Sequence, residues 1–142
     1  MKRTLLTTCL IAAALIFSTN ATNAYAADVS LTINGVGDKG NVMIALFKKD
    51  DKWLGKSTMG TMTAAKKDGV TVSFKDLPEG EYAVSLFVDE NSNGKMDKNA
   101  IGIPTEAYGF SNDASGNFGP PTFEQAKFVV GKDNAAITIT LK

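Results

Sequence analysis

The chain contains no histidine and only one cysteine, Cys9, among its 142 residues. The lack of histidine excludes a Ser-His-Asp triad and a Cys-His pair, and with a single cysteine it also excludes ordinary zinc sites. Catalysis would then need paired carboxylates, or serine with lysine. The acidic pairs, Glu79 with Glu81 and Asp50 with Asp51, stand beside turns and have the simpler interpretation of surface charge. We therefore predict that the protein is not an enzyme; the alternative is a small carboxylate-dependent hydrolase, or an accessory subunit of one.

The N-terminal segment has the three parts of a signal peptide. Two basic residues open the chain, a largely apolar stretch follows at residues 5–17, and Ala24 and Ala26 frame a small-x-small cleavage site. The apolar stretch is too short for a membrane anchor, which needs roughly 20 residues. We predict a signal peptide at residues 1–26 and one exported domain at residues 27–142, periplasmic or secreted, with no membrane span after cleavage.

The exported domain would have neither cysteine nor an excess of basic charge. Without Cys9 it cannot form disulfides even in an oxidising compartment, so its core, a bound metal, or both must hold it together. Of the 15 basic residues in the chain, Lys2 and Arg3 are lost, which leaves 13 against 15 acidic ones. Because no basic stripe stands out, neither nucleic acid nor an anionic membrane surface is expected as a partner.

Apolar and polar residues alternate along most of the exported part, which is the pattern of half-buried β-strands. The alternation is strong at residues 29–33, 42–47, 70–74, 82–88, 128–130 and 137–141, and weaker at 57–65. Turn residues separate these segments, and LPEG at residues 77–80 suits the type I turn of a hairpin. The sequence therefore predicts an all-β fold, an antiparallel β-sandwich of about seven strands, immunoglobulin-like or prealbumin-like, with one long ordered loop.

The long loop runs from residue 89 to about residue 125, where no clear strand pattern is found. Connections of this length inside a compact domain are usually functional or disordered, and the aromatic content here favours order. The aromatic residues are Tyr108, Phe110, Phe118 and Phe123. Either they form a small satellite core under the loop or they present a platform for a sugar or a peptide, and Trp53 has the same two interpretations. We expect the 89–125 loop to bind a glycan, a peptide or an envelope protein.

The loop opens with DENSNGKMD at residues 89–97, which has the spacing of an EF-hand-type calcium loop. Oxygen-bearing side chains fall at the first, third, fifth and ninth positions: Asp89, Asn91, Asn93 and Asp97. Gly94 allows the sharp turn, and Lys95 offers its backbone carbonyl. The bidentate glutamate of the twelfth position is replaced by Ala100, and Glu106 is the candidate for the missing carboxylate. We predict a weak calcium site, with a Kd on the order of 10⁻⁴ to 10⁻³ M; the alternative is a solvated turn.

Two shorter motifs bear on local structure. GVGDKG at residues 35–40 matches the dinucleotide-binding fingerprint, which works only where a helix begins at its end. A β-rich run follows instead, so we interpret the glycines as a hairpin connection and expect no nucleotide. TFEQ at residues 122–125 fits a capping box, with Thr122 as N-cap and Gln125 reaching back, and this predicts one helical turn.

Specific runs of residues stand in and around the long loop. They are LP at 77–78, DEN at 89–91, GIP at 102–104, Glu106, YGFSN at 108–112 and FGPPTF at 118–123. With these runs the chain resembles the bacterial domain-of-unknown-function family numbered 2141, over essentially the whole exported part. The resemblance implies a secreted or periplasmic β-sandwich without an established activity. It implies no catalytic residues, so the predicted function rests on the calcium loop and on the long loop that follows it.

Overall fold

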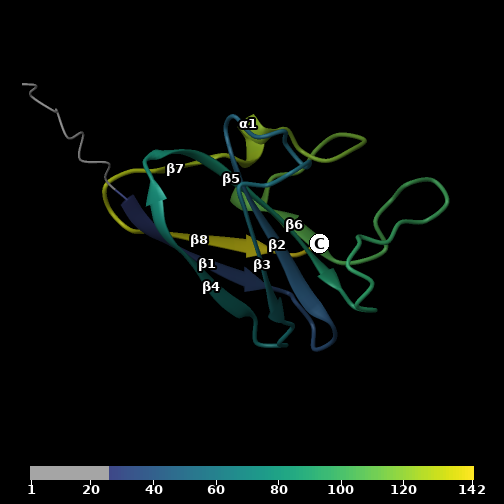
Figure 1. Ribbon diagram of the computed structural model, residues 1–142. Coiled ribbons are helices and arrows are strands. Elements are labelled where there is room, and N and C mark those ends of the chain that lie inside the picture. The colour runs from purple at the N-terminus through teal and green to yellow at the C-terminus, as the bar shows by residue number, and fades with distance from the viewer. Residues whose placement is uncertain (1–25) are drawn as a thin grey trace, which may run out of the picture.

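The computed structural model describes residues 26–142, so the predicted signal peptide lies outside the described residues except for Ala26 (Figure 1). In chain order the elements are β1 (Ala26–Asn34), β2 (Asn41–Lys48), β3 (Met59–Ala64), β4 (Val70–Pro78), β5 (Gly80–Asp89), β6 (Tyr108–Phe110), the 3₁₀ turn η1 (Ser111–Asp113), α1 (Phe123–Ala126), β7 (Phe128–Val130) and β8 (Ala135–Thr140). Within this part of the chain, no helix has the length and apolar character that crossing a membrane requires.

The strands form two sheets that share one apolar core, which confirms the predicted β-sandwich. One sheet has three strands in the order β4-β1-β8. The other has five, in the order β3-β2-β5-β6, with β7 also paired to β5. Every strand pair among the described residues is antiparallel except β1 with β8, which is parallel.

The core between the sheets follows from the alternation in the sequence. In β1, Val29, Leu31 and Ile33 are fully buried, whereas the residues between them are partly exposed. The five-stranded sheet contributes Leu46 and Tyr82, and the Tyr82 hydroxyl donates a hydrogen bond to the Pro78 carbonyl at 2.9 Å. Each large side chain buried in this way stabilises the fold by about 1.5–3 kcal/mol, so the core serves where disulfides cannot.

Two connections were predicted to be hairpins from their turn residues. Both instead carry the chain from one sheet to the other. Residues 35–40 link β1 to β2, and Glu79 alone separates β4 from β5; in both cases the two strands lie in different sheets. The hairpin interpretation was wrong because turn-forming residues indicate a change of direction and not the sheet that receives the next strand. The β-rich run after the glycine motif forms β2, so no helix starts there.

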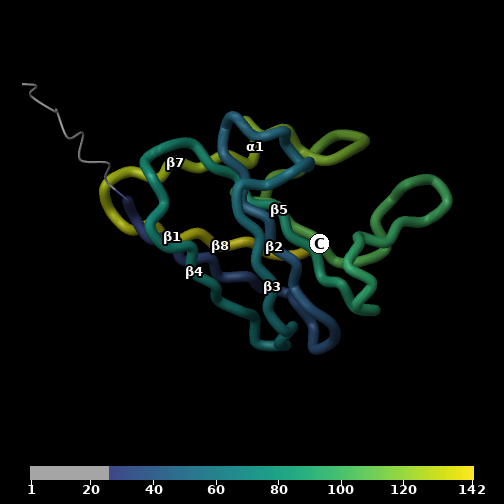
Figure 2. The backbone as a smooth tube through the Cα atoms, in the orientation of Figure 1, coloured from purple at the N-terminus to yellow at the C-terminus, as the bar shows by residue number. Residues whose placement is uncertain are grey.

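The predicted 89–125 loop contains a strand, β6, that its sequence did not reveal. β6 pairs with β5, with Phe110 opposite Ser85, and three residues are too few to show a period of two. Its central residue must be small, because a Cβ on Gly109 would lie 2.7 Å from Cγ2 of Ile139. The strand divides the segment into a first loop (residues 90–107) and a second loop (residues 111–127), and both project from the same end of the molecule (Figure 2).

The capping box predicted in the second loop is confirmed. The Gln125 N–H donates to the Thr122 hydroxyl at 3.3 Å, and the Gln125 side-chain oxygen accepts from the Thr122 N–H at 2.8 Å. The two bonds satisfy donors at the helix start that would otherwise lack a partner, and they stabilise the single turn of α1.

Candidate functional site

The first loop begins at the end of β5, where Asp89 coils the chain around its own carboxylate. The Asp89 side chain is buried, and its two oxygens accept the N–H groups of Asn93 at 3.0 Å and of Gly94 at 2.7 Å. Gly94 has φ +74°, a conformation that a side chain would strain. This geometry agrees with the sharp turn that the spacing of residues 89–97 predicts.

The other predicted ligand side chains lie within the same turn. Asn91 and Asn93 each donate a side-chain N–H to the Asp97 carboxylate, Asn93 at 2.9 Å. The Asn91 side-chain oxygen accepts the Asn93 N–H at 3.1 Å, and that of Asn93 accepts the Lys95 N–H at 2.8 Å. Five residues singled out by spacing alone are therefore brought together by hydrogen bonds.

The candidate cage is poor in charge. Among residues 26–142, no group of three or more acidic, histidine or cysteine side chains is placed to hold a metal ion. Asp89 and Asp97 bring two carboxylates, and Asn91 and Asn93 bring two amide oxygens. Oxygen donors of these kinds suit Ca²⁺, and few carboxylates correspond to weak binding.

Glu106 braces the first loop, a role that the sequence analysis did not assign to it. Its side chain is 8 % exposed, and its two oxygens accept the N–H groups of Glu90 at 3.2 Å and of Asp97 at 2.9 Å. The Thr105 N–H also donates to the Asp97 carbonyl at 2.9 Å. One carboxylate thus joins both ends of the 89–97 turn, which holds the candidate ligands near one another.

The second loop is anchored on an aromatic cluster. The Trp53 ring lies 5.0 Å from Phe47, 6.0 Å from Phe110 and 5.8 Å from Phe123, measured between centroids. Its Nε1–H donates to the Pro121 carbonyl at 2.8 Å. The satellite-core interpretation is confirmed for Trp53, Tyr108, Phe110 and Phe123, which pack in one cluster.

Ser111 fixes the start of the second loop; it stands in the YGFSN run, but the sequence analysis gave it no role. The side chain is fully buried; its hydroxyl accepts the Val84 N–H at 2.8 Å and donates to the Ala126 carbonyl at 2.5 Å. The Asn112 side chain donates to the Lys127 carbonyl at 2.7 Å. The loop is therefore tied to β5 at one end and to α1 at the other.

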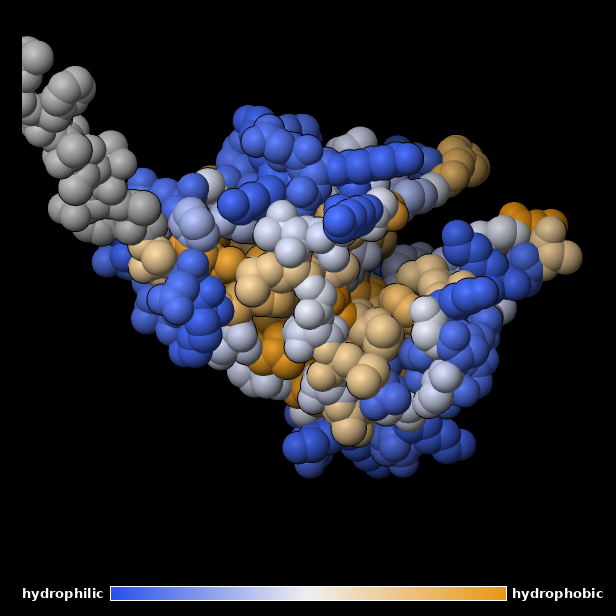
Figure 3. All heavy atoms as spheres, viewed as in Figure 1, coloured by the Kyte–Doolittle hydropathy of each residue, from blue (hydrophilic) through white to orange (hydrophobic). Residues whose placement is uncertain are grey.

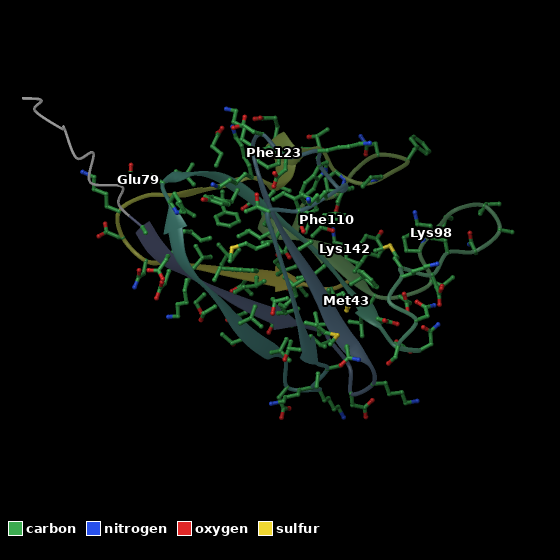
Figure 4. All side chains as sticks on the ribbon, in the orientation of Figure 1. Met43, Glu79, Lys98, Phe110, Phe123 and Lys142 are labelled. Carbon is green, nitrogen blue, oxygen red and sulfur yellow. The ribbon has the colours of Figure 1, made fainter. Side chains whose placement is uncertain are left out.

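An open hollow of about 740 Å³ lies between the two loops, beside β6. Its lining includes two aromatic residues of β6, three apolar residues of the loops and two lysines. These are Tyr108 and Phe110, then Ile101, Ile103 and Phe118, then Lys98 and Lys142. The tips of the loops are apolar and exposed, with Ile101 at 80 % and Phe118 fully in solvent, so Phe118 departs from the satellite core. Figure 3 shows apolar tips on either side of the hollow, and Figure 4 places both lysines on this side of the molecule.

The acidic pairs considered for catalysis do not line the hollow, and one member of each pair, Glu81 and Asp51, has a structural partner. Glu79, at the opposite end of the molecule from Lys98 in Figure 4, is exposed. Hydrogen bonds from Lys127 and Lys49 lower the pKa of Glu81 to about 2, so this carboxyl stays ionised and is unsuited to donate a proton at neutral pH.

The comparisons with known proteins define the family but not an activity. Residues 31–138 match the family described as "Uncharacterized protein conserved in bacteria (DUF2141)". The match covers most of the chain, and the protein therefore belongs to this bacterial family. No curated protein matches the chain, and no solved structure matches it.

Proposed function

We propose that the protein is an exported, non-enzymatic β-sandwich module that takes calcium in the 89–97 loop and binds a ligand in the hollow between its two loops. The proposal rests mainly on one observation. The four candidate ligands meet in one turn, at the base of the loop that forms one wall of the hollow: Asp89, Asn91, Asn93 and Asp97. A glycan, a peptide or an envelope protein is the proposed ligand class.

Calcium would act on the turn by replacing hydrogen bonds with ion contacts. The Asp97 carboxylate accepts the side-chain N–H groups of Asn91 and Asn93. Rotation of each amide would present its oxygen in place of its nitrogen, so a cation could be shared by two amide oxygens and two carboxylates. The ion would then fix the direction in which the first loop leaves β5.

The hollow has the character of a ligand site in size and lining. Pockets for small ligands measure roughly 300–1,000 Å³ and are mostly apolar, with a few polar groups that set orientation. Here apolar side chains from both loops and aromatic residues of β6 line the hollow, and Lys98 and Lys142 are among its polar groups. An exposed aromatic residue such as Phe118 loses little conformational entropy when it covers a ligand.

Export is tested by the mass of the protein recovered after secretion. The proposal requires loss of residues 1–26 and a new N-terminus at Ala27, because Ala24 and Ala26 frame the cleavage site. Intact-mass analysis would measure this directly. Full-length protein retained in the membrane fraction would contradict the assignment of compartment.

Ligand binding is tested through Trp53, the only tryptophan in the chain. Because its indole holds Pro121 in the second loop, ligands in the hollow should change its fluorescence. We would titrate soluble peptidoglycan fragments, oligosaccharides and short uncharged peptides in the presence of calcium.

A ligand held in the hollow should bind at least about tenfold more weakly to Phe118→Ser, since an aromatic anchor contributes more than about 1.4 kcal/mol. The matched control is Val129→Ser, an exposed apolar residue on β7 that does not line the hollow. The same affinity for both variants, or no response to any of the three probe classes, would contradict the ligand proposal.

A further inference from the structure

The free edge of the five-stranded sheet, β3, lacks the features that usually keep an edge strand from pairing. Natural edge strands are protected by charge, proline, bulges or a covering segment. β3 reads MGTMTA, without charge or proline, and it pairs with β2 at six consecutive residues with no register shift. All its residues except Thr63 are exposed, and as the terminal strand of the sheet it has no strand paired on its outer side.

The other sheet edges are protected in the ways that β3 is not. β4 carries Lys75 and ends at Pro78, and its pairing with β1 contains a register shift. β6 is covered where its first residue exchanges backbone hydrogen bonds with Lys142. At the outer edge of β8, the Thr140 N–H donates to the Asp113 carboxylate at 2.8 Å. β7, which pairs with β5 on the same side as β6, is only three residues long, and shortness is itself a form of edge protection. Among the described residues, β3 is therefore the one longer edge strand without such protection.

A row of apolar side chains leads across the outer face of the sheet to this edge. Met62 of β3 lies opposite Met43 of β2, which lies opposite Phe87 of β5, which lies opposite Tyr108 of β6. Directly opposite residues share one face of a sheet, so the four side chains form one row. Met62, at its outer end, is 59 % exposed. Figure 3 shows the apolar band over β2 and β3, and Figure 4 labels Met43 within it.

We propose that a second copy of this chain binds here, with the two β3 strands pairing antiparallel about a two-fold axis so that the two five-stranded sheets become one. β3 itself provides what the edge requires: an extended, uncharged strand with an apolar residue facing the same side as Met43. Two-fold pairing also covers both free edges at once, whereas a different partner would have to carry a matching strand of its own. The inference is independent of the proposed calcium and ligand sites.

The register that the row favours is centred on Met62. In this register Met62 lies opposite Met62 of the second copy, and the apolar row runs without a break through both molecules. Thr61 then faces Thr63, and Gly60 faces Ala64, so five of the six β3 residues pair within β3 and only Met59 has its partner outside the strand. Centring on Thr61 would instead set Met62 against Gly60 and interrupt the row.

Sedimentation equilibrium of the purified protein at micromolar concentrations tests the association. The wild type is expected at twice the monomer mass. Met62→Lys, which places two positive charges together at the axis, should sediment as the monomer; its side chain is exposed, so the fold should be unaffected. Val129→Lys on β7, similarly exposed, is the matched control and should remain dimeric. A monomeric wild type, or a dimer that survives Met62→Lys, would overturn the proposal.

Cysteine cross-linking tests the register, because Cys9 is the only native cysteine and can be replaced by serine if it is retained. Opposite residues of an antiparallel pair have Cα atoms about 4.5–5.5 Å apart, within the range of a disulfide. Met62→Cys should therefore form a covalent dimer under mild oxidation, and Val129→Cys should not. Cross-linking through Thr61→Cys in place of Met62→Cys would overturn the register, and no cross-link at either position would overturn the edge pairing.

Discussion

Calcium at about 100 times its Kd, roughly 10–100 mM for the affinity predicted above, is expected to raise the melting temperature of the protein by roughly 8–13 °C. An ion that binds only the folded state stabilises it by RT ln(1 + [L]/Kd), which is about 2.7 kcal/mol at 100 times Kd. A domain of this size shifts by roughly 3–5 °C for each kcal/mol. Magnesium should be less effective, because it demands a small octahedral site and gives up its water reluctantly. Differential scanning calorimetry with calcium, magnesium and chelator measures the shift.

Asp97→Asn should remove most of the calcium-dependent shift, because it halves the carboxylate charge of the candidate cage while keeping a side chain of the same size. Glu90→Gln is the matched control: it makes the same chemical change in the same loop, at an exposed residue that is not a predicted ligand. An equal calcium response in the two variants would contradict the assignment of ligands. Equal melting curves of the wild type with calcium and with chelator would contradict the calcium site itself.

Gly40→Ala is expected to lower the free energy of unfolding by about 2–5 kcal/mol. Gly40 has φ +79°, which costs an alanine roughly 1–2 kcal/mol. A Cβ at this position would also lie 2.1 Å from the Asp89 carbonyl oxygen and 2.6 Å from Cα of Glu90. The backbone at the start of the first loop must then move, and overpacking of this kind typically costs about 1–3 kcal/mol. Urea unfolding without calcium measures the loss.

Gly37→Ala separates the two contributions, because Gly37 has φ +74° but no atom within 4 Å of a Cβ. It should cost only the roughly 1–2 kcal/mol of the backbone conformation. Since Gly40→Ala displaces Asp89, it should also weaken the calcium response, which Gly37→Ala should leave intact. Equal losses of stability in the two variants would show that the close approach to Asp89 has no energetic consequence.

The fold could be predicted from the sequence where one face of a strand is buried. Val29, Leu31 and Ile33 alternate with partly exposed residues because the period of a strand is two, and residues 41–46 of β2 and 84–88 of β5 alternate in the same way. Pairing could not be predicted: the parallel contact of β8 with β1, and the passage from β4 to β5 between sheets, depend on packing of distant segments. β6 could not be predicted, because its central residue is a glycine. Gly109 is required there by the close approach of Ile139, a residue 30 positions away.

The candidate site shows the same division between local and distant information. The spacing of Asp89, Asn91 and Asn93 acts within one turn, so the sequence could predict that these side chains meet. Glu106 acts across 16 residues, through the Glu90 N–H, and its bracing role required the folded chain. Phe118 was grouped with the other aromatics, but its exposure depends on how the second loop is tied down at its two ends.

The central claim, that calcium orders the first loop beside the hollow, is tested most directly by hydrogen exchange with and without chelator. Removing calcium should speed exchange in residues 90–107 and leave β1, β2 and β5 protected, because the sandwich core does not include the loop. The second loop should change little, since Ser111 and the Trp53 cluster anchor it independently. Identical exchange in residues 90–107 under both conditions would contradict the account, and so would an equal acceleration of all strands.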